Sequence, residues 1–169
     1  MSKRVYRYNS DRRTVTTTIV YFVVMLAVSL LIWAMYVGGY FSAWFISLSL
    51  ALVALMAISI PRKIVVDSQV VTIECVLEVV EIATSEIVSV RQIKAEECRW
   101  IIPIFGSRGF FGYYGYYLDL ATLERVRFYA TEWQNLVEIV DIYDDRYYVS
   151  CRQAEALVAQ IKSCAVGLN

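Results

Sequence analysis

An uncharged stretch runs from Thr14 to Pro61 and limits the folds open to this chain of 169 residues. A single helix of roughly 48 residues would be roughly 70 Å long, more than twice the ~30 Å hydrocarbon core of a bilayer. The stretch divides at Gly38-Gly39 into two apolar arms, 17–37 and 43–60, each about long enough for one crossing. The sequence therefore predicts a two-helix transmembrane hairpin over residues 17–60, stopped by Pro61.

The charges on either side of the hairpin predict its orientation. Basic residues stand at the outer ends of both arms: Arg12, Arg13, Arg62 and Lys63. The connection between the arms is uncharged and flanked by aromatic residues that favour the headgroup level: Trp33, Tyr36, Tyr40, Phe41, Trp44 and Phe45. By the positive-inside rule, residues 1–16 are a basic cytoplasmic tail and residues 61–169 a cytoplasmic domain, with both termini on that side.

Two other interpretations of the apolar stretch are open. A cleaved signal peptide also has a basic start and an apolar run, although here the run is too long and a second apolar segment follows. A soluble protein could instead bury a helical hairpin, although helices that are apolar all round are rare outside lipid. Small residues along the second arm could pack within the hairpin or against another chain: Ser47, Ser49, Ala51, Ala54 and Ala57.

After Pro61 the apolar pattern changes to the period of two that is typical of β-strands. Seven short strands are predicted, followed by an amphipathic helix at 153–164; the strands are 63–66, 70–75, 78–82, 87–93, 124–130, 136–142 and 146–150. Two antiparallel sheets bent into a partly open seven-stranded barrel, with the helix over one end, would cover the strand edges economically.

Several short motifs in this domain carry a family resemblance. They are Pro61-Arg62-Lys63, Ser85-Glu86-Ile87, the segment Phe105–Tyr117, Tyr129-Ala130-Thr131 and Asn135-Leu136-Val137. Together they resemble the bacterial pleckstrin-homology (PH) domain family, which often follows one or two membrane helices. The resemblance spans about 62–165 and implies a PH-like fold at the bacterial cytoplasmic (inner) membrane. It implies no defined ligand, because this superfold hosts many binding roles.

The segment Trp100–Tyr117 is the most unusual part of the sequence, with a glycine at every third position between aromatic residues. It lacks the Gly-Lys-Ser/Thr ending of a P-loop and opens no helix, which excludes nucleotide-phosphate loops. Either it packs over the domain as a structural lid, or it forms an aromatic surface for a protein partner, a second copy or the bilayer. The candidate contact residues are Trp100, Phe105, Gly106, Gly109, Phe110, Phe111, Gly112, Tyr113, Tyr114, Gly115 and Tyr116.

Composition argues against several functions. The chain has no His, and its four Cys form no CxxC pair, so the sequence predicts no catalytic, metal or cofactor site. The soluble part is mildly acidic, which excludes nucleic acid as a partner. The first hairpin loop, Asp67-Ser68-Gln69, lacks the basic residues that phosphoinositide-binding PH domains use there. We therefore expect a non-catalytic protein-interaction or scaffold module, with lipid binding or an accessory role in a membrane complex as alternatives.

Overall fold

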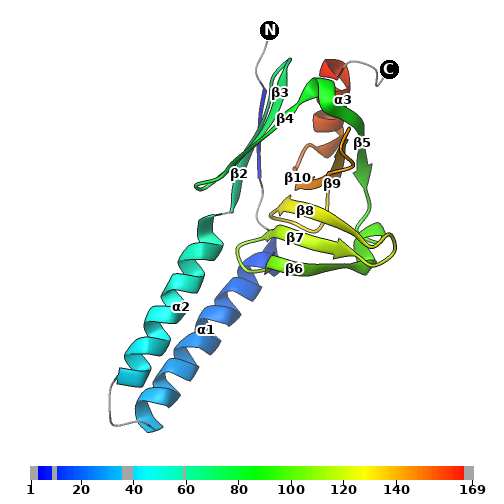
Figure 1. Cartoon of the computed structure of the whole chain (residues 1–169). Helices are drawn as coiled ribbons and strands as arrows, with labels where there is room; N and C mark the ends of the chain where they lie inside the picture. Colours follow the sequence, from blue (N-terminus) through cyan, green and yellow to red (C-terminus); the bar gives the residue numbers. More distant parts are fainter. Residues whose placement is uncertain (1–3, 9–10, 36–39, 59, 166–169) are drawn as a thin grey trace.

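The computed structural model describes residues 4–8, 11–35, 40–58 and 60–165, with side chains except at 42 and 55–58. Two helices, α1 (Arg12–Met35) and α2 (Tyr40–Ile58), extend together from one side of a mostly β domain (Figure 1). The predicted turn at Gly38-Gly39 lies outside the described residues. The first helix begins at Arg12, five residues before the predicted arm, and the second ends before Pro61, as expected.

The first sheet has the strand order β1-β2-β3-β4 and joins segments from both sides of the helices. Its strands are β1 (Arg4–Arg7), β2 (Pro61–Val66), β3 (Val70–Cys75) and β4 (Val79–Ala83). The pairing of β1 with β2 is antiparallel and runs from Arg4 opposite Val66 to Arg7 opposite Lys63. Part of the segment that was predicted to be a cytoplasmic tail is therefore an edge strand of the domain.

The second sheet has six strands in the order β5-β9-β10-β8-β7-β6. Neighbouring strands are antiparallel except β10 and β8, which are parallel. The strands are β5 (Ile87–Ile93), β6 (Ile101–Arg108), β7 (Tyr113–Asp119), β8 (Glu124–Ala130), β9 (Leu136–Asp141) and β10 (Arg146–Ser150). Two 3₁₀ turns, η1 (Thr84–Glu86) and η2 (Glu97–Trp100), precede β5 and β6.

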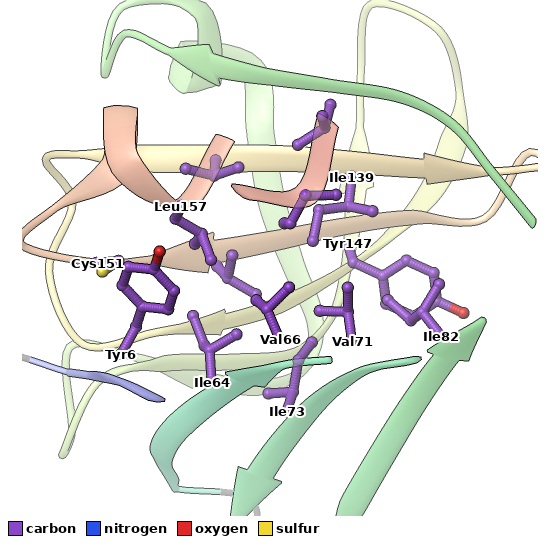
Figure 2. Close-up of a cluster of buried hydrophobic side chains, with 14 of the residues drawn as sticks. Tyr6, Ile64, Val66, Val71, Ile73, Ile82, Ile139, Tyr147, Cys151 and Leu157 are labelled. Carbon is purple, nitrogen blue, oxygen red and sulfur yellow. The ribbon is translucent and has the colours of Figure 1, made fainter. Parts of the chain in front are cut away.

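The main core lies between the two sheets and under the C-terminal helix α3 (Ala154–Cys164) (Figure 2). Alternate residues of the first sheet, such as Ile64, Val66 and Ile73, meet Val137 and Ile139 of the second sheet. The helix adds its apolar stripe, which includes Leu157 and Ile161. The prediction of a mostly β domain that ends in a helix is confirmed.

The prediction of seven strands was too low, because the described residues contain ten. Besides β1, the two missed strands are β6 and β7, which fall in the glycine-rich aromatic segment. A glycine at every third position interrupts the apolar alternation by which a strand is recognised. This segment is therefore a β-hairpin at one edge of the second sheet rather than a lid over a barrel.

A second, aromatic core covers the opposite face of the six-stranded sheet. The ring of Phe128 lies 4.5 Å from that of Tyr117 and 4.7 Å from that of Tyr148, measured between centroids, and it also stacks on Trp133 at 5.6 Å. Such pairs contribute about 0.5–1.5 kcal/mol each beyond the burial of their surface. The strands β8, β9 and β10 are thus largely buried on both faces, and β7 and β6 extend the sheet from this packed part.

The helix α1 is long and apolar enough to cross a bilayer, and its apolar segment is not buried inside the structure. The described apolar part of α2, Ala43–Ala54, is shorter. Among the described residues of α1 only Thr14 and Thr18 are buried. Ser29 donates a hydrogen bond to the carbonyl of Met25 in its own helix, which satisfies its hydroxyl within an apolar segment. The two crossings remain a prediction.

Candidate functional site

The turn between β6 and β7 reaches the first turns of α1, and this contact is the candidate functional site. In Figure 1 these two strands are the part of the second sheet nearest to the helices. The turn is closed by a hydrogen bond of 2.8 Å from the amide of Gly109 to the carbonyl of Gly112. Inside the turn, the Ser107 hydroxyl donates to the carbonyl of Phe110 at 2.6 Å, and the Tyr117 hydroxyl donates to the carbonyl of Ser107. The turn therefore has a defined shape of its own.

Two threonines one helical turn apart connect α1 to the domain. The Thr18 hydroxyl accepts a hydrogen bond of 2.9 Å from the amide of Phe111 and donates to the carbonyl of Thr14 at 2.7 Å. The Thr14 hydroxyl donates to the carbonyl of Thr131, just after β8, at 3.0 Å. Residues at i and i+4 share one face of a helix, so both threonines face the domain. Their burial, to 2% and 8% exposure, makes the contact specific.

Four aromatic rings lie beside these hydrogen bonds. Phe110 lies 5.8 Å from Tyr21 and 5.6 Å from Phe22 of α1, again between ring centroids. Phe111 lies 6.2 Å from Phe22 and 4.7 Å from Phe110, both in edge-to-face arrangements. These separations fall within the 4.5–7 Å range of favourable aromatic pairs.

Gly109 allows the turn to approach the helix. Its φ of +98° lies in the left-handed region, and a Cβ at this position would lie 3.3 Å from the methyl carbon of Thr17. A side chain here would be strained by the backbone angle and would also push the turn away from α1. The glycine repeat is thus explained in part by the contact with the helix.

The predicted contact residues differ widely in exposure. Phe110 (6% exposed) and Tyr114 are buried, as are Gly109 and Gly112, while Phe111, Tyr113 and Gly115 are half-buried. Phe105 (79% exposed), Trp100, Gly106 and Tyr116 are exposed. The tip of the segment therefore packs on α1, and its other residues leave an open surface along β6.

That open surface is the outer edge of the second sheet. Among the described strands, β6 has one hydrogen-bonded neighbour, namely β7. Its exposed apolar side chains are Ile102, Ile104 and Phe105, and Trp100 of η2 stands just before it. An apolar edge strand with free backbone groups is a template for a partner or a surface that must be covered.

A cavity of about 560 Å³ lies on the other side of the docked turn. Three arginines line it, together with Thr16, Thr17, Gly109, Tyr113 and Trp133: Arg12 and Arg13 of α1, and Arg108 of β6. Burial raises the pKa of Tyr113, and the charge of the nearby Asp11 raises it further. Sequence reasoning treated Arg12 and Arg13 only as flanking charges and overlooked Arg108, although it lies inside the singled-out segment.

Comparison with known proteins agrees with this architecture. Residues 62–165 match the family model described as "Bacterial PH domain", which is more than half of the chain. The chain belongs to the bacterial PH domain family. No curated protein and no solved structure matches it. The matched range of this PH domain begins after α2, so β1 and both helices lie outside it.

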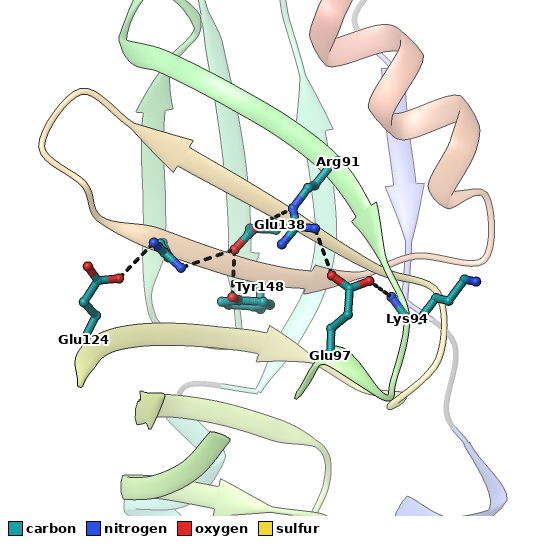
Figure 3. Close-up of polar contacts among 7 residues, drawn as sticks. Arg91, Lys94, Glu97, Glu124, Glu138 and Tyr148 are labelled. Atoms are coloured by element: carbon teal, nitrogen blue, oxygen red, sulfur yellow. Dashed lines mark hydrogen bonds and ion pairs between the residues drawn. The ribbon is translucent and has the colours of Figure 1, made fainter. Parts of the chain in front are cut away.

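A polar network crosses the aromatic face of the PH domain (Figure 3). The buried Glu138 carboxylate accepts hydrogen bonds from the Nε of Arg91 at 2.6 Å and from the Tyr148 hydroxyl at 2.8 Å. Burial raises the pKa of Tyr148, and the hydrogen bond to the carboxylate raises it further. Glu97 gives Arg91 a second carboxylate partner at 2.8 Å. The network satisfies a buried charge within the sheet, which is a structural role.

The hydrogen bond between Thr18 and the Phe111 amide can be tested by Thr18→Val. The substitution keeps the shape of the side chain but leaves a partly buried amide without an acceptor, which costs about 1–3 kcal/mol. We expect hydrogen–deuterium exchange in a peptide covering 109–114 of the full chain to become at least about fivefold faster. Thr16→Val makes the same change at an exposed position and should leave the rate unchanged; equal rates in the two variants would contradict the docking.

Proposed function

We propose that the chain is a membrane-tethered bacterial PH domain that acts as a non-catalytic protein-interaction module at the cytoplasmic face. The helices anchor it, the docked β6–β7 turn holds it in one orientation, and the exposed β6 edge receives the partner. The observation that carries the proposal is the combination of an apolar, unburied α1 with two buried threonines at its start. PH domains are generally non-catalytic interaction modules, which supports this function.

The exposure of α1 supports the tether. A core helix of a soluble protein is mostly buried, whereas the apolar window of α1 is not buried at all. Without a bilayer, this surface would be a large exposed apolar patch of the kind that soluble monomers avoid. The aromatic side chains of Trp33, Tyr40 and Trp44 lie exposed near the far ends of the helices, where the second interface would lie.

The pairing of β1 with β2 supports a hairpin rather than a single crossing. One strand precedes the helices and the other follows them, yet they are hydrogen-bonded neighbours. The chain must therefore leave and re-enter the same domain, so both helix ends next to the domain lie on one side of the bilayer. Basic residues at those ends, among them Arg12 and Arg62, favour the cytoplasmic side.

The β6 edge supports a protein partner. Free backbone groups on an edge strand can pair with an extended segment of another chain, and exposed apolar side chains beside them add affinity. Ile104 and Phe105 lie next to each other on this strand, and both are exposed. Scaffold or regulatory roles would use such a surface to gather a partner at the membrane.

The tether and its orientation can be tested with reporters fused after Asn169. We expect a green fluorescent protein fusion to be fluorescent and to sediment with membranes, and an alkaline phosphatase fusion to be inactive, because the C-terminus lies in the cytoplasm. An active phosphatase fusion, or a fluorescent fusion that stays soluble, would contradict the proposal.

The partner surface can be tested with a photo-crosslinking residue at Phe105 of the full chain in cells. We expect a cross-linked protein adduct that Ile104→Ser reduces at least about threefold, since one exposed apolar contact contributes about 1 kcal/mol. The matched control is a crosslinker at Leu123, which is also exposed but lies in the turn between β7 and β8. Lipid adducts alone at Phe105, or the same protein adduct at both positions, would contradict a protein partner at β6.

A further inference from the structure

Two cavities meet at Arg108, one lined by arginines and the other mainly apolar. We infer that together they bind one anionic phospholipid, with its phosphate among Arg12, Arg13 and Arg108 and an acyl chain between the helices. The inference rests on the membrane placement of α1 proposed above. It concerns one lipid molecule bound at a defined site, as distinct from the bulk lipids that surround the helices.

The three arginines give the first cavity a positive charge that an anion would neutralise. Arg91, Arg127 and Arg146 of the same domain each pair with a carboxylate. Within the described part of the chain, the three arginines of the cavity form no such ion pair. Arg108 instead lies over the ring of Trp133, with its guanidinium carbon 5.9 Å from the centroid. Asp11, directly before Arg12, is a nearby acid, but it does not line the cavity.

The place of Arg12 and Arg13 in α1 strengthens this requirement. Both stand in the first turn of the helix, which holds no acidic residue. The backbone dipoles make this end of a helix positive, so cations are disfavoured there and anions are favoured. A bound phosphate would offset both the repulsion between the arginines and the unfavourable helix end.

The position of Arg108 separates this site from an ordinary membrane flank. The positive-inside rule accounts for Arg12 and Arg13, which directly precede the apolar segment. It does not account for Arg108, which comes from the end of β6 and reaches the cavity only because the turn docks on α1. Guanidinium groups match phosphate geometry well, since they donate two parallel hydrogen bonds.

The second cavity is lined mainly by apolar side chains, which suits an acyl chain. Its volume is about 390 Å³, and its apolar lining comes from α1, α2 and the hairpin: Tyr21, Met25, Leu52, Val53, Pro103 and Phe110. Tyr21 lies nine residues after Arg12 in the helix, which is about 14 Å along its axis. A phosphate at the first turn would thus have its acyl chains at the depth of this groove.

These two features together favour a phospholipid over a free anion. Inorganic phosphate would use the arginines and leave the apolar groove unoccupied. The site also differs from the β2–β3 loop, where the Asp67 carboxylate accepts the amide of Ser68 at 2.6 Å. A phospholipid headgroup and inorganic phosphate share the phosphate that the arginines would bind, so competition by inorganic phosphate distinguishes them.

The test uses the full chain in nanodiscs that contain phosphatidylglycerol and phosphatidylcholine with identical acyl chains. Lipids retained after release from the disc are counted by native mass spectrometry. We expect the wild type to retain one phosphatidylglycerol at least about tenfold more often than phosphatidylcholine. Arg108→Gln should reduce this retention about tenfold, because it removes a charge-assisted hydrogen-bond donor.

Two further variants make the result specific. Arg62→Gln removes a charge from the same membrane flank outside the cavity and should leave retention unchanged. Leu52→Trp fills the apolar groove and should weaken retention of phosphatidylglycerol. Hydrogen–deuterium exchange of the peptide covering 109–114 checks that each variant keeps the docked turn.

Other outcomes would overturn the inference. Equal retention of the two lipids, or unchanged retention in Arg108→Gln, would show that the arginines do not select a lipid of net negative charge. Displacement of the lipid by millimolar inorganic phosphate would indicate a site for free anions. Unchanged lipid retention in Leu52→Trp would show that the apolar groove does not hold an acyl chain. A chain that does not enter the nanodisc at all would contradict the proposed tether instead, so the two failures are distinguishable.

Discussion

The antiparallel ladder between β1 and β2 is the constraint on which the rest of this structure depends. These strands lie on either side of the helical pair in the sequence and next to each other in the sheet. The chain between these strands must return to the same sheet, so α1 runs away from the domain and α2 runs back to it. Tyr6 of β1 also enters the main core, which ties the segment before the helices to the domain by packing as well as by hydrogen bonds.

The docked turn adds a second attachment and removes the freedom that a simple linker would leave. Each hydrogen bond at Thr14 and Thr18 contributes about 0.5–1.5 kcal/mol, and each aromatic pair a similar amount. The domain therefore has one orientation relative to α1, with the β6 edge on the side from which the helices extend (Figure 1). The same attachment brings Arg108 to Arg12 and Arg13, so the cationic cavity depends on it.

Sequence patterns predicted the features that depend on local composition. Apolar runs located both helices, and alternation located the strands from β2 to β5 and from β8 to β10. The fold class followed from the motifs that resemble PH domains, and the family match supports it. What the sequence could not supply was non-local. Residues 4–7 carry no strong pattern and become a strand only by pairing with β2, and Thr14 and Thr18 differ from their neighbours only in what they contact. The glycines that permit the β6–β7 hairpin also prevented its recognition from the sequence, because they interrupt the alternation of apolar and polar residues.

The most direct measurement of this account is a disulfide across the β1–β2 ladder. Residues opposite each other in antiparallel strands have Cα atoms about 4.5–5.5 Å apart, within the range that a disulfide bridges. The variant Arg7→Cys with Lys63→Cys, expressed as the full chain in membranes, should form this disulfide under mild oxidation, identified by mass spectrometry of the linked peptides. Arg7→Cys with Ser68→Cys should not, since Ser68 lies beyond the far end of the ladder. Failure of the first pair, or equal cross-linking of both, would contradict the pairing and with it the closed path of the helices.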